Sequence, residues 1–255
     1  MMLIDFAYLN LASRPDRRAH AEAGFAKAGL TVRRHEGELI TKLNHTPTTQ
    51  TLRMFNRTTG AIGCWNGQVD IIRSSSADII GVFEDDVVLC EDFAERLDYI
   101  LGHLPDDFHI MYLGATFHIP GVWCHHKDCS TWGSVGKDAW PTSNPRIMRV
   151  PAQWGTYAYL VNGARADEVL TALDAIMSDA DGIDHAFIRI GTALNTYCFV
   201  PGCCKQFDSR SDIGTGVTKF SNFKSLGPYW YAEHMEDFDP TLYSWTEGKY
   251  LNEVQ

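Results

Sequence analysis

Apolar and polar residues alternate along this chain in blocks that predict strands and helices in turn. Residues 3–9 form an apolar, aromatic-rich run suited to a buried strand. A helix is expected from about 15 to 28, because Ser13 followed three residues later by Asp16 is a helix-start signature. Residues 31–35 form a plausible second strand. This strand, helix and strand opening is typical of an α/β sheet.

The middle of the chain continues the alternation. Residues 60–72 have helical spacing, and residues 79–83 form a short apolar run fit for a central parallel strand buried on both faces. Another helix is expected from about Glu91. Residues 41–59 are polar and rich in threonine, so we expect a loop there. The apolar stripes comprise Ile62, Trp65, Val69 and Ile72 in the first of these helices and Phe93, Leu97, Leu101 and Leu104 in the second.

The second half of the chain adds strands and a helix around a long insertion. Strand-like runs occupy 108–113, 157–161 and 196–201, and residues 164–177 have helical spacing. The stretch between the first two of these strand-like runs, from Gly114 to about Gln153, is rich in Trp, His, Gly, Pro and Ser. A loop of that length inside a compact domain is usually functional. We therefore expect a single α/β domain over residues 1–255, with an embellishing loop at about 114–153 and an irregular tail from about 214.

The composition excludes some partners and favours one compartment. The 255 residues include 32 acidic and 22 basic ones, a formal net charge of −10, so no global basic field would collect nucleic acid or anionic membrane. No run approaches the roughly 20 apolar residues of a membrane span, and the N-terminus lacks signal-peptide features. Seven cysteines, an odd number, favour reduced thiols. A cytoplasmic protein without an integral membrane segment is expected.

Three consecutive carboxylates, Glu84, Asp85 and Asp86, follow directly after the apolar run at 79–83. Neighbouring like charges raise one another's pKa, and a bound divalent cation removes that cost. Mg²⁺ and Mn²⁺ prefer carboxylate and phosphate oxygens. In an extended segment Glu84 and Asp86 point the same way and can share one ion, while Asp85 takes a ribose hydroxyl or orients a neighbour. The alternative interpretation is that the acids simply begin a surface loop.

The insertion contains a group of histidines and cysteines. His118, Cys124, His125, His126 and Cys129 fall within twelve positions. Such a group could supply a structural Zn²⁺ site, with Cys124, His125 and Cys129 as ligands. The spacing is not a familiar zinc pattern, however, and a loop with scattered polar residues is the commoner explanation.

Short blocks of residues follow one another in a recognisable order along the chain. They are Tyr8-Leu9-Asn10-Leu11 with Arg14 and Arg17, Gly60-Ala61-Ile62-Gly63-Cys64 with Trp65, Val82-Phe83-Glu84-Asp85-Asp86-Val87, Tyr112-Leu113-Gly114, Gly155-Thr156-Tyr157-Ala158-Tyr159-Leu160 running into Asn162-Gly163-Ala164, Ile183-Asp184, and Ser211-Asp212-Ile213. In this succession, over about residues 5–213, the chain resembles glycosyltransferase family 25, which includes lipopolysaccharide and collagen hydroxylysine sugar transferases.

The resemblance implies a GT-A type nucleotide-sugar fold, with a mostly parallel central sheet flanked by helices. It also implies transfer of galactose or glucose, with inversion, from a UDP-hexose donor to a hydroxyl of a glycan or of a glycosylated or hydroxylated peptide. The implied cofactor is Mn²⁺ or Mg²⁺, bound through Glu84 and Asp86. The implied donor-binding residues are Asn10, Leu11, Arg14, Arg17 and Asp85. For the two arginines, a solvated first helical turn is the alternative interpretation.

Asp184 is the carboxylate that we expect to act as general base, because an inverting displacement needs a base on the face opposite the leaving UDP. A helix could start just after Asp184, so helix capping is the alternative explanation of this residue.

Other roles are left more open by the sequence. On the acceptor side the candidates are Tyr157 and two tryptophans of the insertion, Trp123 and Trp132, which suit sugar stacking. A third metal ligand could come from Asp208, Asp212, His185 or His234.

Two further function classes remain as alternatives. A metal-dependent nucleotidyltransferase also places acids at a strand end, but it usually shows a Gly-rich phosphate loop near the start, and none is evident. A non-catalytic carbohydrate-binding relative is the second alternative. The joint presence of Glu84, Asp86 and Asp184 weighs against it.

Overall fold

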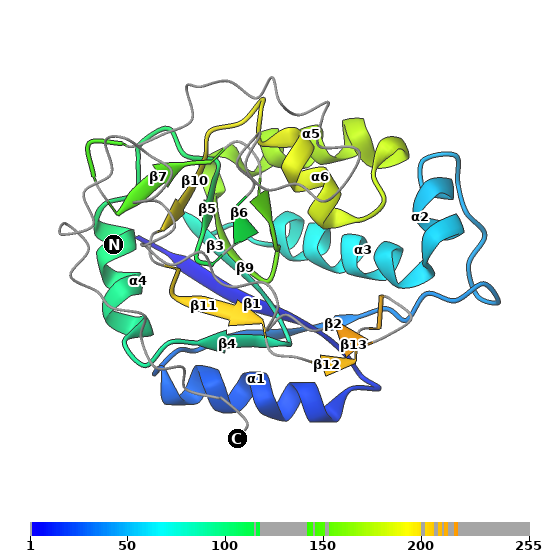
Figure 1. The fold of residues 1–255 in the computed structure, drawn as a ribbon, viewed down its shortest axis with the longest axis horizontal. Helices are drawn as coiled ribbons and strands as arrows, with labels where there is room; N and C mark the ends of the chain where they lie inside the picture. The colour runs from blue at the N-terminus through cyan, green and yellow to red at the C-terminus, as the bar shows by residue number, and fades with distance from the viewer. Residues whose placement is uncertain are drawn as a thin grey trace.

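The computed structural model describes residues 2–114, 116–117, 142–144, 146–150, 153–199, 202–206, 209–210, 212–213 and 217–218. Within these residues, helices cover both faces of a central seven-stranded sheet (Figure 1). The strands lie in the order β2-β1-β3-β9-β5-β10-β7. The predicted α/β class, with a mostly parallel central sheet flanked by helices as expected of a GT-A fold, is confirmed.

Most strands of this sheet point the same way. The parallel set comprises β1 (Ile4–Leu11), β2 (Arg33–Gly37), β3 (Ile79–Glu84), β5 (Ile110–Tyr112) and β10 (Thr196–Phe199), while β7 (Ile147–Arg149) and β9 (Ala158–Asn162) run the opposite way. The expected opening is confirmed, because β1 pairs in parallel with β2. The central strand β3 is parallel to β1 on one side, as predicted, but antiparallel to β9 on the other.

Three short pairs of strands accompany the main sheet. They are β4 (Val87–Leu89) with β11 (Cys204–Gln206), β6 (Thr116–Phe117) with β8 (Gln153–Trp154), and β12 (Ser209–Arg210) with β13 (Val217–Thr218). Because β4 begins immediately after the acidic triplet, its pairing with β11 brings residues near 206 back to these acids.

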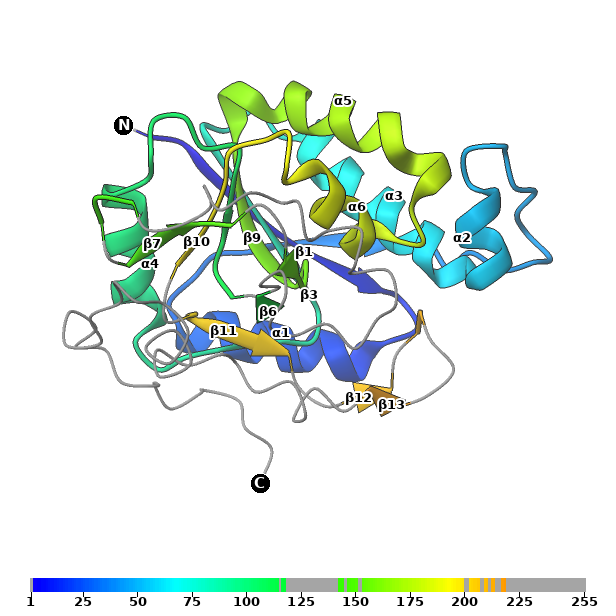
Figure 2. The ribbon, with the colours of Figure 1, turned by 45° about the horizontal axis from the view of Figure 1, so that its top comes forward.

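The two faces of the sheet carry different helices, as Figures 1 and 2 show. One face packs α1 (Pro15–Lys27) and α4 (Phe93–Gly102), and the other packs α3 (Thr59–Ser74), α5 (Ala166–Ile176) and α6 (Ile183–Ile190), with the 3-10 turns η2 (Gly163–Arg165) and η3 (Met177–Asp179) at the ends of α5. Neighbouring strand residues alternate between the faces, so Val82 joins the α3 side and Phe83 the α1 side.

The predicted apolar stripes of α3 and α4 form the contacts with the sheet. All four predicted α3 positions are buried, from Ile62 to Ile72. In α4, Phe93 and Leu97 are buried and Leu101 is partly buried, while Leu104, predicted in the same stripe, lies two residues beyond the end of the helix and packs against the same cluster. Helical periodicity therefore identified the core-facing residues of both helices.

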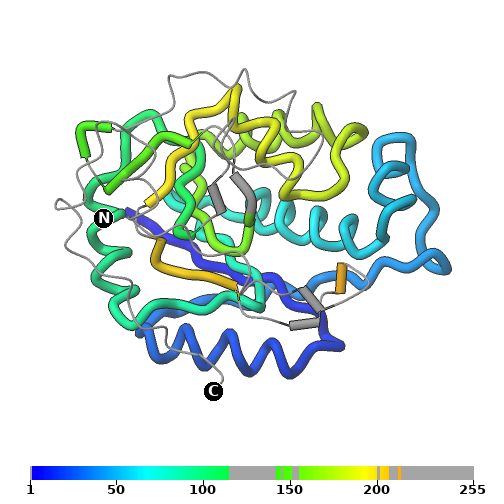
Figure 3. The backbone as a smooth tube through the Cα atoms, viewed as in Figure 1, coloured from blue at the N-terminus to red at the C-terminus, as the bar shows by residue number. Residues whose placement is uncertain are grey.

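Residues 41–59, expected to be a loop, contain the short helix α2 (Leu52–Arg57), which Figure 3 places on the path from β2 into α3. Met54 in this helix has no exposed surface, and Phe55 packs partly buried against the same core. The prediction of a loop was wrong because tertiary packing stabilises a helical turn whose threonine-rich surroundings carry no helical period.

The start of α1 also differs from the prediction in detail. The helix begins at Pro15, as expected, but Arg14 rather than Ser13 precedes it, and no side chain caps it. Asp16 in the first turn complements the positive end of the helix dipole.

Several predictions lie outside the described residues. These are Trp123, Trp132, the Cys124, His125 and Cys129 group, Asp208, His234, most of the insertion and the tail, so the zinc and acceptor roles stay predictions, as does the single domain. Among the described cysteines all five are free and four are buried, as expected of reduced core thiols. In the described part of the chain no helix is both long and apolar enough to cross a membrane. The cytoplasmic location stays a prediction.

Gly163, which follows β9, packs against the segment that precedes β3. A Cβ at this position would lie 1.9 Å from the carbonyl oxygen of Ala77, a backbone atom that cannot rotate away. We expect Gly163→Ala to lower the free energy of unfolding by about 1–3 kcal/mol, the usual cost of overpacking. Urea unfolding followed by circular dichroism measures this loss.

The matched control is Gly102→Ala at the end of α4, where no atom lies within 4 Å of an added Cβ. This variant should keep the wild-type stability or gain up to about 1 kcal/mol from helix propensity. An equal loss in both variants would contradict the packing explanation.

Candidate functional site

A cleft opens where β1 and β3 end side by side. Leu9 of β1 pairs with Glu84 of β3, so Asn10 and Leu11 lie level with the acids that follow β3. The cleft has a volume of about 310 Å³. Its lining residues come from β1, from α1, α3 and α6, from the segment after β2, from the acidic triplet and from β11. Ligands of open α/β sheets bind at this edge, outside the carboxyl ends of the strands.

The acidic triplet forms a turn rather than a fully extended segment. β3 ends at Glu84, and β4 begins at Val87. The carboxylates of Glu84 and Asp86 nevertheless approach the same group, as the prediction of a shared ligand requires. The Nε2 amide nitrogen of Gln206 donates to Oε2 of Glu84 at 3.2 Å and to Oδ1 of Asp86 at 3.3 Å.

Asp85, the middle acid, orients two neighbours. Its carboxylate accepts hydrogen bonds from Nδ2 of Asn10 at 2.7 Å and from Nη1 of Arg17 at 2.9 Å. The same Arg17 nitrogen lies 3.4 Å from Oδ2 of Asp86. Arg17 is only 8% exposed, so the interpretation of this arginine as part of a solvated helical turn was wrong. A buried guanidinium of this kind neutralises part of the triplet's charge.

Arg14 contacts the C-terminal part of the chain. It forms ion pairs with Asp16, at 2.8 Å, and with Asp212. The hydroxyl of Thr58 donates to the carbonyl oxygen of Ile213 at 2.5 Å. Residues 212–213 therefore connect the start of α1 with the start of α3. Asp212 and Ile213 both line the cleft between the two helices.

Asp184 lies in the first turn of α6 and faces Glu84 across Thr156. Gly182 precedes the helix and no side chain caps it, so the capping explanation of Asp184 was wrong. Oδ1 of Asp184 accepts hydrogen bonds from the backbone N–H of Thr156 at 2.9 Å and from its hydroxyl at 2.8 Å. The same hydroxyl lies 3.0 Å from Oε1 of Glu84. Because a hydroxyl carries one proton, it can donate to only one ionised carboxylate at a time.

Thr156 and Gln206 are two of the site residues that sequence reasoning missed. Thr156 belongs to one of the resemblance blocks but had no predicted role, although it is 2% exposed and joins two carboxyl groups. The sequence signal for a special backbone position beside Thr156 was Gly155, since glycine readily adopts the positive φ, here 100°, that the chain has before β9. No local pattern marked Gln206, because its partners lie about 120 residues earlier in the chain.

The environment of Thr156 and Gln206 destabilises the ionised form of three carboxyl groups, those of Glu84, Asp86 and Asp184. Burial raises the pKa of Glu84 well above its ordinary value, and the charges of Asp86 and Asp184 raise it further. Burial also raises the pKa of Asp86 to about 6, although Arg17 opposes the change. The pKa of Asp184 is raised for the same reason, against the hydrogen bonds from Thr156. A cation among these groups would relieve both desolvation and repulsion.

The donor set around the triplet suits a hard divalent cation. Among the described residues that line the cleft, six are acidic and only Arg17 is basic, so an anionic ligand needs a cation there. Within the described residues no group of three or more His, Cys, Asp or Glu side chains is arranged around a single metal position. Mg²⁺-type sites usually use one or two carboxylates, with waters and substrate phosphates completing the shell. Glu84 and Asp86 meet that requirement.

Two further candidates do not lie in the cleft. Tyr157 is 7% exposed and belongs to the core cluster around Phe83, where its carbonyl oxygen accepts the N–H of Glu84 at 2.9 Å. His185 lies 3.3 Å from Asp181 rather than beside the triplet. Of the open candidates for a third ligand that the structure describes, only Asp212 lines the cleft.

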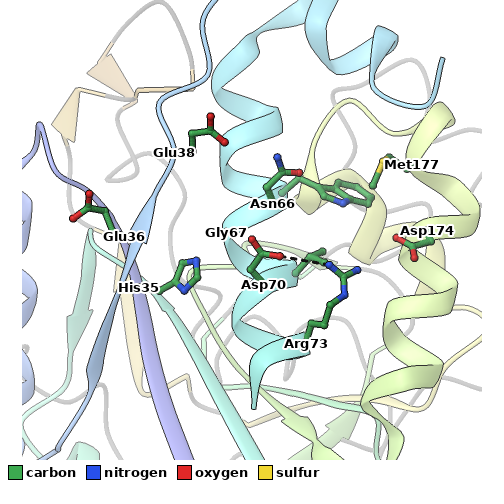
Figure 4. Close-up of a pocket in the computed structure, with 11 residues that line it drawn as sticks. His35, Glu36, Glu38, Asn66, Gly67, Asp70, Arg73, Asp174 and Met177 are labelled. Atoms are coloured by element: carbon green, nitrogen blue, oxygen red, sulfur yellow. Dashed lines mark hydrogen bonds and ion pairs between the residues drawn. The ribbon is translucent and has the colours of Figure 1, made fainter. Parts of the chain in front are cut away.

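A second cavity, also of about 310 Å³, lies between β2, α3 and α5 (Figure 4). His35 points into it from β2, and Asp70 and Arg73, 3.4 Å apart, reach it from α3. None of the predicted site residues that the structure describes lines this cavity.

Comparison with protein-family models gives no match, and comparison with curated proteins gives none either. Membership of family 25 therefore stays a prediction. Among solved structures, the chain is similar to the galactosyltransferase LgtC in complex with donor and acceptor sugar analogues, with 11% identity, a TM-score of 0.44, and coverage of 77% of this chain and 73% of LgtC.

Two other glycosyltransferase structures are similar to a comparable extent. One acts in glycosylation of the major capsid of PBCV-1, with 10% identity, a TM-score of 0.40, and coverage of 74% of this chain and 73% of that one. The other is GlyE of Streptococcus pneumoniae TIGR4, with 6% identity, a TM-score of 0.42 and coverage of 77% of this chain. The chain spans only 45% of GlyE.

Thr156→Val removes the hydroxyl between Glu84 and Asp184 while keeping the side-chain shape. Because two partly buried carboxyl groups then lose a hydrogen-bond partner, we expect the free energy of unfolding to fall by about 1–3 kcal/mol in metal-free protein at neutral pH. Urea unfolding in the presence of a chelator measures the loss. Thr192→Val is the control, because that exposed hydroxyl donates to a local backbone carbonyl, that of Arg189, and its effect should stay within about 0.5 kcal/mol. Equal stabilities for both variants would contradict the bridging role.

Proposed function

We propose that this chain is a metal-dependent glycosyltransferase that moves a hexose, galactose or glucose, from a UDP-sugar to a hydroxyl of a glycan or of a glycosylated or hydroxylated peptide, with inversion. The observation that carries the proposal is the convergence of Glu84, Asp86 and Asp184 in one cleft at the carboxyl ends of β1 and β3. The family resemblance of the sequence supports the same reaction.

The charge of the cleft supports a diphosphate donor held through a cation. Six acidic lining residues would repel a nucleotide diphosphate, and two of them, Glu84 and Asp86, approach a common point. Glu84 and Asp86 would hold a divalent ion, and that ion would neutralise the charge that develops on the leaving diphosphate. We propose Mn²⁺ or Mg²⁺ in this role.

The end of β1 and the start of α1 are the proposed donor side. Asn10 and Arg17 are held by Asp85, and Leu11 gives the cleft an apolar wall. Arg14 lies close by, where its ion pairs with Asp16 and Asp212 position its guanidinium. Such preformed contacts reduce the ordering that donor binding requires.

Asp184 is the proposed general base. Its carboxylate takes the proton of the acceptor hydroxyl as the oxygen attacks the anomeric carbon, while the bond from that carbon to the UDP oxygen breaks and its electron pair leaves with UDP. The raised pKa of Asp184 makes it a stronger base than an exposed aspartate. The two hydrogen bonds from Thr156 fix the orientation of this carboxylate.

The donor prediction is tested by hydrolysis without an acceptor. UDP-galactose or UDP-glucose should be hydrolysed slowly in the presence of Mn²⁺, and both a chelator and Asp86→Ala should abolish the release of UDP measured by mass spectrometry. Undiminished turnover in the chelator would eliminate the metal mechanism. Transfer of a nucleotidyl group instead would identify a nucleotidyltransferase, and tight sugar binding without turnover of any common nucleotide sugar would identify a binding protein.

The base prediction is tested by Asp184→Asn. Loss of a general base should reduce turnover by about 10²- to 10⁴-fold. Binding of Mn²⁺ and of UDP, measured by calorimetry, should be retained. Asp181→Asn is the matched control, because Asp181 lies three residues earlier, pairs with Arg53 and does not line the cleft. Equal turnover in the two variants would remove Asp184 from the mechanism.

A further inference from the structure

Gln206 occupies the position between the two outer acids of the triplet. It is the last residue of β11, and the antiparallel register places it opposite Val87, immediately after the triplet. Its amide nitrogen lies 3.2 Å from Glu84 and 3.3 Å from Asp86. Both distances are at or beyond the upper end of the usual range for such bonds. The side chain therefore lies where two carboxyl groups converge, without being tightly bound to either.

A second amide near Glu84 behaves differently. Nε2 of Gln68 donates to Oε1 of Glu84 at 2.9 Å, and Oε1 of Gln68 accepts a hydrogen bond from the hydroxyl of Tyr159, also at 2.9 Å. Gln68 has no exposed surface, so this orientation is fixed from both ends. Gln206, in contrast, is partly buried and lines the cleft.

We propose that Gln206 is the third protein ligand of the divalent cation bound by Glu84 and Asp86, and that it binds through its amide oxygen. The inference rests on the proposed metal-dependent function. Half a turn about the last side-chain torsion exchanges the amide nitrogen and oxygen at nearly the same place, and that torsion is broad. Amide carbonyl oxygens are ordinary ligands of hard cations.

The same residue then serves the site in two states. In the metal-free protein the amide N–H₂ group donates to carboxylates whose charge is only partly compensated. In the loaded protein the neutral oxygen completes a set in which two carboxylates balance the two positive charges of the ion. A third carboxylate at this position would leave the set negative and oppose an anionic diphosphate.

The test measures Mn²⁺ binding without any donor sugar, from the signal of free Mn²⁺ in electron paramagnetic resonance. Gln206→Met keeps the length of the side chain but offers no hard ligand. Its affinity for Mn²⁺ should fall about tenfold or more, at least as much as when second-shell partners are removed. Gln206→His should still bind, and its preference should move about tenfold from Mg²⁺ toward Co²⁺ or Ni²⁺, because imidazole suits those metals. A hydrogen bond to the carboxylates alone would not change metal preference.

Lys205→Met is the matched control on the same strand. Lys205 pairs with Val88, and strand alternation directs it to the other face of the ribbon. This variant should bind Mn²⁺ at least as tightly as the wild type. Thermal unfolding in chelator tests whether each variant folds. If Gln206→Met does not fold, the metal preference of Gln206→His is the deciding result.

The outcomes separate this inference from the function on which it rests. If the wild type binds no Mn²⁺ and Asp86→Asn behaves identically, the metal-dependent function fails together with the role of Gln206. If the wild type binds Mn²⁺, Asp86→Asn does not, and both Gln206 variants retain wild-type affinity and preference, only the role of Gln206 is overturned.

Discussion

The accommodation of negative charge after β3 is the constraint on which the cleft depends. A strand buried on both faces delivers Glu84, Asp85 and Asp86 to one turn, where like charges raise one another's pKa. Arg17 of α1 neutralises part of that charge from a buried position. The packing of the α1 N-terminus beside β4 is therefore stabilised by ion pairs as well as by apolar contacts. Loss of the ion pairs would expose the apolar contacts to water, and loss of the apolar contacts would expose the ion pairs.

The remaining carboxylate charge is stabilised by hydrogen bonds from neutral groups. Thr156 joins Glu84 to Asp184, and Gln206 joins Glu84 to Asp86. Neutral donors stabilise carboxylates through hydrogen bonds but cannot cancel their charge. The site thus keeps an excess of negative charge, which costs stability in the metal-free protein and favours binding of a cation to the folded state.

The residues that line the cleft come from two parts of the chain. Hydrogen bonds from Asn10 and Arg17 to Asp85 hold together the end of β1, the start of α1 and the turn after β3. Gln206 and residues 212–213 line the cleft from the C-terminal part of the chain. A ligand in the cleft would therefore contact the strand ends on one side and Gln206 with residues 212–213 on another.

The sequence by itself determined the elements with strong periodicity and the chemistry written into adjacent residues. Helical spacing identified the buried face of α3, an apolar run identified β3, and three neighbouring acids predicted side chains that line the cleft, because these signals are local. Only the tertiary structure decided that β9 inserts antiparallel beside β3, that residues 52–57 are helical, and that Thr156 and Gln206 contact the acids. Those outcomes depend on packing and hydrogen bonds between segments up to about 120 residues apart, and no local pattern encodes such partners.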